Sequence, residues 1–232
     1  MVTWGMGAEA LRYDDANRLE ETIDAAENST YRYYDKNGKL TKLKDARNNE
    51  TEYEYDVLGR MIKQTNALEG EVEYQYDAVG NRTKVIDARD NETDYEYDVL
   101  NRLVKVTDPF DNYTEQEYDA NGNQTKVIDK LGNETEYTYN SRNMRTKVTD
   151  ALDNETDFTY DENGNLTAKT MPDDEEYTYV YDVLNRRTEA TDPLDHTSYT
   201  YYSSVGTITK RKDAEGNETE YSYPIFSQVL FS

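Results

Sequence analysis

The chain contains no cysteine, so disulfide bonds and thiolate metal sites are excluded. Proline occurs only four times and tryptophan once in 232 residues. No apolar run approaches the length of a membrane span, and the first twenty residues lack the basic start and apolar stretch of a secretion signal. The sequence therefore predicts a chain that does not insert into a membrane and is held together without covalent cross-links.

Basic residues are scarce relative to acidic ones. Lysine and arginine together number 26 against 49 aspartates and glutamates, a formal net charge of −23 at pH 7. Because phosphate binding needs a basic surface, this excess argues against nucleic acid and against anionic membrane surfaces as partners. Such a charge combined with 35% hydrophobic residues is typical of disorder. The 23 tyrosines oppose that interpretation and predict an aromatic, amphipathic core.

One tyrosine recurs at a constant spacing of 21 residues, without a single insertion. The eleven tyrosines of this series are Tyr13, Tyr34, Tyr55, Tyr76, Tyr97, Tyr118, Tyr139, Tyr160, Tyr181, Tyr202 and Tyr223. Such a period indicates a repeat architecture. We expect ten tandem repeats forming one domain over residues 13–223, preceded by a non-repeat segment, 1–12, and followed by an apolar tail, 224–232.

Each repeat carries two turn signals. Four residues after the tyrosine comes glycine or asparagine, as in "YDVLG" at 55–59, which is typical of a type I turn opened by aspartate and closed by a left-handed residue. A second turn follows ten residues later, as in "DARDN" at 87–91. The turns of the first kind end on Asn17, Gly38, Gly59, Gly80, Asn101, Gly122, Asn143, Gly164, Asn185 and Gly206. Each repeat thus holds two chain reversals and two short strands.

Both strands of a repeat alternate between two kinds of side chain. In residues 91–97, Thr93, Tyr95 and Tyr97 share one face and acidic residues occupy the other. Residues 102–107 place valines on one face and Lys105 on the other, and lysine recurs at this position in seven of ten repeats. We expect an all-β fold, a continuous coiled antiparallel sheet in the form of a ribbon, tube or partial shell, wound around its Tyr/Thr/Val face. A right-handed β-helix is the alternative.

The stretch "YDVLGRMIKQTNALEGEVEYQYDAVGNRTKVIDARDNETDYEYD", residues 55–98, resembles the tandem YD repeats of the Rhs family. The resemblance extends from Leu11 to Tyr223. It implies sheets wound into hollow shells, which enclose a C-terminal toxin in bacterial members and form surface proteins in others. It also implies a structural, extracellular role and no activity of the repeat itself. No "DPxGxxDG"-like cleavage signature, toxin domain or plug domain is found, so we expect either a fragment or a protein that is used differently.

Candidate chemical sites are few. The single histidine, His196, stands where other repeats carry asparagine at the end of the second turn, and we interpret it as a turn residue. Paired carboxylates occur everywhere, but a regular ladder offers no site distinct from the others, so no enzymatic activity is expected. No cofactor is expected. Calcium is the cation that clustered turn aspartates would suit, although their turn-capping role explains them more simply.

Ten N-x-S/T acceptors mark candidate N-glycosylation sites. They are Asn28, Asn49, Asn81, Asn91, Asn112, Asn123, Asn133, Asn154, Asn165 and Asn217. Glycosylation of a surface protein is one explanation, and a repeat consensus that happens to contain "NxT" is the other. Exposed aromatic residues would also permit glycans as binding partners.

The two ends are the most apolar and least repetitive parts of the chain. The candidate self-assembly residues there are Trp4, Ile225, Phe226, Val229, Leu230 and Phe231. An open meander leaves an unpaired strand at each end, and unlike edges that pair head to tail propagate as a filament. The first hypothesis is therefore a non-enzymatic structural protein of the cell surface or extracellular space whose partner is itself. The alternatives are a fragment of a toxin-encapsulating shell and a carbohydrate-binding surface module.

Overall fold

The computed structural model describes residues 2–5 and 8–223, with side chains from Ala10 onwards. Its described residues form strands and turns, and none of them forms a helix that could cross a membrane. Twenty-two strands of this described part are assigned to one sheet. The chain divides into two compact units, Met1–Glu115 and Gln116–Ser232, and the boundary falls within strand β12 (Tyr113–Tyr118).

The strands of the first unit are β1 (Val2–Gly5), β2 (Ala8–Tyr13), β3 (Leu19–Ile23), β4 (Ser29–Tyr34), β5 (Leu40–Lys44), β6 (Glu50–Tyr55), β7 (Met61–Thr65), β8 (Glu71–Tyr76), β9 (Arg82–Ile86), β10 (Glu92–Tyr97) and β11 (Leu103–Thr107). Those of the second unit are β13 (Gln124–Ile128), β14 (Glu134–Tyr139), β15 (Arg145–Thr149), β16 (Glu155–Tyr160), β17 (Leu166–Thr170), β18 (Glu176–Tyr181), β19 (Arg187–Thr191), β20 (Thr197–Tyr202), β21 (Ile208–Lys212) and β22 (Glu218–Glu220).

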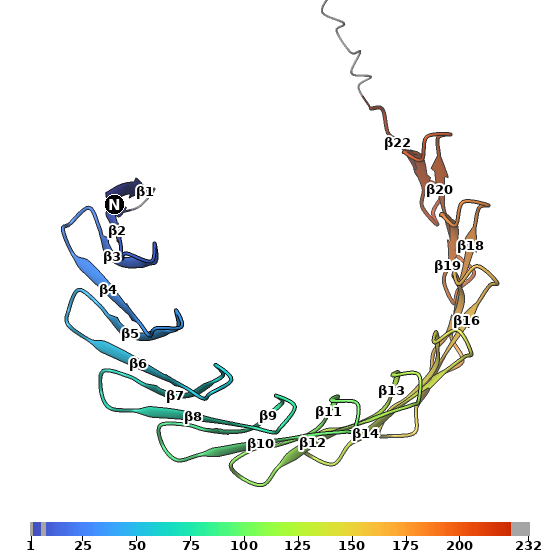
Figure 1. Ribbon diagram of the computed structural model, residues 1–232. Coiled ribbons are helices and arrows are strands. Elements are labelled where there is room, and N and C mark those ends of the chain that lie inside the picture. The colour runs from blue at the N-terminus through green and yellow to red at the C-terminus, as the bar shows by residue number, and fades with distance from the viewer. Residues whose placement is uncertain (1, 6–7, 224–232) are drawn as a thin grey trace, which may run out of the picture. The chain divides into compact units, whose positions relative to one another are not determined.

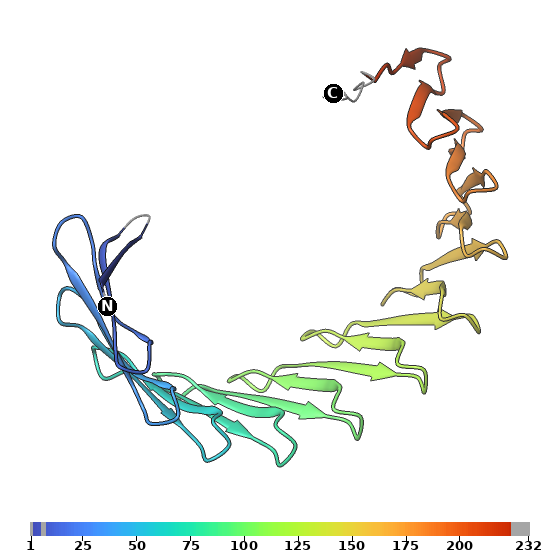
Figure 2. The same cartoon turned by 45° about the horizontal axis from the view of Figure 1, so that its top comes forward.

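Within each unit, every strand pairs antiparallel with the next strand in the sequence (Figures 1 and 2). The predicted meander of hairpins is thereby confirmed, and the β-helix alternative is wrong because its coils would not reverse direction. The segment expected to lie outside the repeats also joins the sheet, since β1 pairs with β2. The residues of the expected apolar tail, 224–232, lie outside the described part of the chain.

Both predicted turns are present in every repeat. In the first kind, the Asn17 N–H donates to the Asp14 carbonyl at 2.9 Å and the Asp14 N–H donates to the Arg18 carbonyl at 2.9 Å. This is a type I turn closed by a left-handed residue, here Asn17 with φ 61°. Twenty of the described residues have positive φ, two per repeat, and they include all ten positions predicted for the first turn.

A register shift that the sequence does not predict lies just before tyrosines of the 21-residue series. Glu96 lies opposite Lys105 but Tyr97 lies opposite Leu103, so Val104 is an extra residue in its strand. The same shift occurs in nine hairpins of the first kind among the described strands. In five repeats a threonine at the extra position donates its hydroxyl to the carbonyl across the bulge, as Thr41 does to Tyr33 at 3.2 Å. The hydroxyl thus supplies a donor where the strand ladder is interrupted.

The expected enclosed aromatic core is absent from the described residues. No large side chain there is fully buried, and the two buried residues are Ala10 and Glu21, at 8% and 6% exposure. The tyrosines are mostly half-buried, because each ring is covered by neighbours in the same sheet and not by a second layer. The prediction that the rings form a core was wrong because it assumed that the sheet would fold onto itself within this stretch. The wider coil of the sheet stays a prediction.

At Gly80, the left-handed backbone conformation alone should determine how a substitution changes stability. Its φ is +104°, and a Cβ placed on this residue would meet nothing within 4 Å. We expect Gly80→Val to lower the free energy of unfolding by about 1–2 kcal/mol, since a branched residue is strained in this region. Gly80→Asn is the matched control, because Asn101 and Asn143 already adopt φ 62° and 60° at equivalent positions. Urea denaturation of both variants checks this, and equal losses would contradict it.

Candidate functional site

One face of the sheet carries forks in which a lysine bridges two carboxylates. The ammonium of Lys42 lies 2.8 Å from a Glu50 oxygen and 2.7 Å from a Glu52 oxygen, both on the next strand. Comparable forks surround Lys63, Lys84, Lys126 and Lys147. The recurring lysines therefore lie beside acidic residues of the next strand. Since two carboxylates meet each lysine, this charged face remains acidic.

Hydrogen bonding within the forks shifts the titration of both partners. The carboxylate of Glu50, followed by that of Glu52, accepts hydrogen bonds from Lys42 and raises the pKa of its ammonium. The pKa of Glu50 is lowered, chiefly because it accepts the hydrogen bond from Lys42. These pairs are solvent-exposed, so they fix the register and charge pattern of the face more than they stabilise the sheet.

The opposite face, here called the aromatic face, stacks arginines on rings. Tyr95 lies opposite Val106, and Tyr74 opposite Val85. The guanidinium carbon of Arg82 lies 5.9 Å from the ring centre of Tyr74 and 5.0 Å from that of Tyr95. An arginine thus bridges the rings of consecutive repeats, at distances within the range of cation–π attraction.

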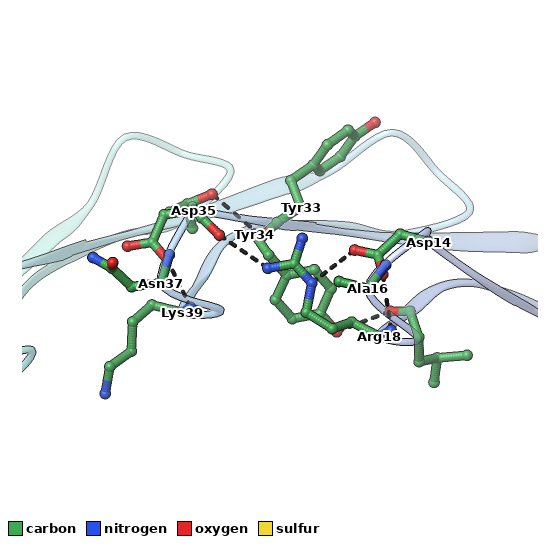
Figure 3. Close-up of polar contacts among 10 residues, drawn as sticks. Asp14, Ala16, Arg18, Tyr33, Tyr34, Asp35, Asn37 and Lys39 are labelled. Atoms are coloured by element: carbon green, nitrogen blue, oxygen red, sulfur yellow. Dashed lines mark hydrogen bonds and ion pairs between the residues drawn. The ribbon is translucent and has the colours of Figure 1, made fainter.

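A polar clamp joins consecutive repeats at the first turn. The Arg18 guanidinium donates to the Asp14 carboxylate at 2.7 Å and to the backbone carbonyl of Asp35, in the next repeat, at 2.9 Å (Figure 3). It also lies 4.8 Å above the ring of Tyr34, whose hydroxyl donates to the Leu19 carbonyl at 2.8 Å. The same contacts recur around Arg60 and Tyr76. Each tyrosine of the 21-residue series at these sites therefore binds its repeat to the one before.

Asparagine replaces the arginine of this clamp in three repeats. The Asn81 amide donates to the Asp77 carboxylate at 2.9 Å and to the side-chain oxygen of Asn101, one repeat on, at 2.9 Å. The pairs Asn123–Asn143 and Asn165–Asn185 repeat this contact. A sequence signal was available but overlooked, because asparagine after the turn glycine always precedes a repeat whose turn ends in asparagine.

The aspartates that open the turns direct both carboxylate oxygens into the turn itself. One Asp45 oxygen accepts from the N–H groups of Arg47 and Asn49 at 2.8 and 2.9 Å, and the other accepts from the Asn49 amide at 2.8 Å. The Asn49 amide is the largest cause that lowers the pKa of Asp45. The described residues contain no group of three or more His, Cys, Asp and Glu side chains placed to hold a metal ion. Turn capping thus accounts for these aspartates.

The ten candidate glycosylation asparagines fall into two structural classes. Seven close the second turn, and their amides donate to its opening aspartate. The other three, Asn81, Asn123 and Asn165, donate to two acceptors each. A glycan attached to these three would remove an amide hydrogen that links two repeats, so the second-turn class is the better suited to modification.

His196 closes a second turn, as predicted. Its N–H donates to one Asp192 oxygen at 2.9 Å, and its ring Nδ1 lies 3.1 Å from the other. Among the candidate self-assembly residues, Trp4 belongs to strand β1, and its side chain is outside the described part. Ile225, Phe226, Val229, Leu230 and Phe231 also lie outside the described residues, so a joint between the two ends stays a prediction.

Comparison with known proteins agrees with this geometry. The model of the family described as RHS Repeat matches residues 34–70, 76–112, 118–155, 146–176 and 160–197. No curated protein matches the chain. Among solved structures, "Crystal Structure of TcdB2-TccC3-TEV" superposes with a TM-score of 0.63 at 14% identity, over 92% of this chain and 13% of that one.

Two further solved structures have the same fold. "Crystal Structure of TcdB2-TccC3 without hypervariable C-terminal region" gives a TM-score of 0.55 at 17% identity, over 91% of this chain and 15% of that one. "Crystal Structure of TcdB2-TccC3-Cdc42" gives 0.52 at 16% identity, over 89% and 16%. The chain therefore spans less than a fifth of the length of the structures that it resembles.

Proposed function

Because the chain belongs to the RHS repeat family, we propose that it is a non-enzymatic structural segment of a larger shell-like protein that works outside the cell. The family matches cover most of the repeat region, and the solved structures with the same fold are several times longer. In this proposal, the chain forms part of a wall, and the enclosed or neighbouring protein belongs to the rest of the assembly.

The uncovered aromatic face is the observation that carries this proposal. No second layer buries its rings in the described residues, and no large side chain there is fully buried. Several apolar turn tips are also almost fully exposed, including Val57, Val99 and Val183 at 102%, 97% and 96%. Exposed apolar side chains of this kind are available for contacts with further protein. A wall segment would obtain those contacts from the remainder of its shell.

The absence of enzymatic activity is part of the same proposal. The carboxylates that repeat along the chain are used in lysine forks or turn caps, and the same arrangement returns in successive repeats. A catalytic centre needs groups whose surroundings set them apart from their neighbours. The regularity of the ladder supports a structural role.

Self-assembly into filaments is the competing outcome, and electron microscopy distinguishes the two. The purified chain would be imaged in negative stain across a series of salt and calcium concentrations, together with a Trp4→Ala, Phe226→Ala variant. We expect small particles of uniform size under all conditions, as for a wall segment without its shell. Long uniform threads that vanish in the double variant would overturn the shell proposal in favour of head-to-tail assembly.

A further inference from the structure

The aromatic face follows a rule that places an arginine between two rings. Arg145 repeats the arrangement of Arg82, because its guanidinium carbon lies 5.4 Å from the ring centre of Tyr137 and 5.5 Å from that of Phe158. In both cases one ring comes eight residues before the arginine and the other thirteen residues after it. Each of these two guanidinium groups therefore lies over two rings.

Arg187 does not follow this pattern of one arginine between two rings. Its guanidinium carbon lies 5.5 Å from the ring centre of Tyr179, eight residues earlier, but the position thirteen residues later is Thr200. Thr200 pairs with Arg211, which occupies the position held by Val106 in the middle repeats. One ring and one apolar side chain of the repeat are thus replaced by a small hydroxyl residue and a cation.

These replacements coincide with a depression of about 450 Å³ on the second unit, whose lining includes Arg187, Thr200, Arg211, Thr219 and Tyr221. Within the described part of the chain, neither of its arginines forms an ion pair with a carboxylate. The acidic residue in the lining, Asp213, caps its own turn by accepting from the Asn217 N–H at 2.7 Å and from the Asn217 amide at 2.9 Å.

We propose that this depression binds a ligand consisting of a planar aromatic ring that bears an anionic group. The ring takes the place left by Thr200 and lies against the Arg187 guanidinium, as the rings of Tyr95 and Phe158 do for the equivalent arginines. A carboxylate, sulfate or phosphate on that ring accepts paired hydrogen bonds from Arg211. The whole chain carries a formal net charge of −23 and repels anions, so binding of an anionic ligand needs a specific site and cannot come from general electrostatic attraction.

The test uses 4-hydroxyphenylacetate as the probe, with 4-hydroxyphenylacetamide and acetate as the neutral and non-aromatic comparisons. Dissociation constants would be measured on the full chain by chemical-shift titration in low salt. We expect saturable binding of the aromatic acid, at least about tenfold tighter than either comparison, the effect of one charge-assisted hydrogen bond or one stacked ring. Equal binding of acid and amide, or no saturation, would overturn the proposal.

Three variants locate the site. Thr200→Tyr restores the missing ring and should abolish binding, whereas Arg211→Gln should remove the preference for the acid over the amide. Arg145→Gln is the matched control, because Arg145 already lies over two rings of the protein, and the affinity of this variant for the probe should stay within about twofold of the parent chain. Unchanged binding by Thr200→Tyr would refute the site, and if that variant fails to fold by circular dichroism, Arg211→Gln decides.

Discussion

Replacement of Tyr76 by alanine is expected to lower the free energy of unfolding by about 2–3 kcal/mol, and replacement by phenylalanine by about 1 kcal/mol. The Tyr76 ring lies 4.7 Å beneath the Arg60 guanidinium carbon, and its hydroxyl donates to the Met61 carbonyl at 2.8 Å. Alanine removes both contacts between consecutive repeats, whereas phenylalanine removes only the hydrogen bond. Urea denaturation followed by circular dichroism measures both losses.

Tyr33 provides the control for this prediction. It is adjacent in sequence to a tyrosine of the 21-residue series, but 46% of it is exposed. Tyr33→Phe is expected to change stability by no more than about 0.5 kcal/mol, as at most surface positions. A double-mutant cycle between Tyr76→Ala and Arg60→Ala should give a coupling of about 0.5–1 kcal/mol, the value of an exposed cation–π contact. Additive effects would mean that the clamp does not act as a unit.

Acidification is expected to unfold the chain cooperatively below about pH 4. Hydrogen bonds donated within the turns lower the pKa of fourteen opening aspartates, and at Asp77 they outweigh burial, which raises it. Since each folded pKa lies below the unfolded value near 3.8, the associated stability is fully present above that value. It is lost as the pH falls through the folded pKa values.

Thermal melts between pH 7 and pH 2 check this dependence. The melting temperature should fall steeply below pH 4, in spite of the reduced net negative charge. Asp56→Asn is the informative variant, because Asn66 already opens a turn with an amide oxygen that accepts from the Leu68 and Gly70 N–H groups at 2.8 and 3.0 Å. Its melting temperature should depend less on pH than that of the parent chain. A melting temperature that rises towards pH 3 would show that relief of charge repulsion dominates.

The turns and the alternation of side chains along each strand depend only on residues close together in the sequence. The left-handed position at Gly59 or Asn101, the aspartate that opens its turn and the alternation of Thr93, Tyr95 and Tyr97 are all set by neighbouring residues. Turn chemistry acts within four or five residues, and side-chain alternation follows from the geometry of a single strand. The sequence alone could therefore predict two turns and two short strands per repeat, the charged and aromatic faces, and His196 as a turn residue.

Pairing between strands decided the remaining features. The extra residue at Val104 is a property of the register between two strands, and the bond from Asn81 to Asn101 joins residues twenty positions apart. Whether the rings became a core depended on a second layer of protein, which the described residues do not supply. The missing ring beside Arg187 also depends on strand pairing, because this pairing places Tyr179 and Thr200 on the same face of the sheet. Local rules determined which structure each repeat forms, and contacts between repeats determined which partners its side chains have.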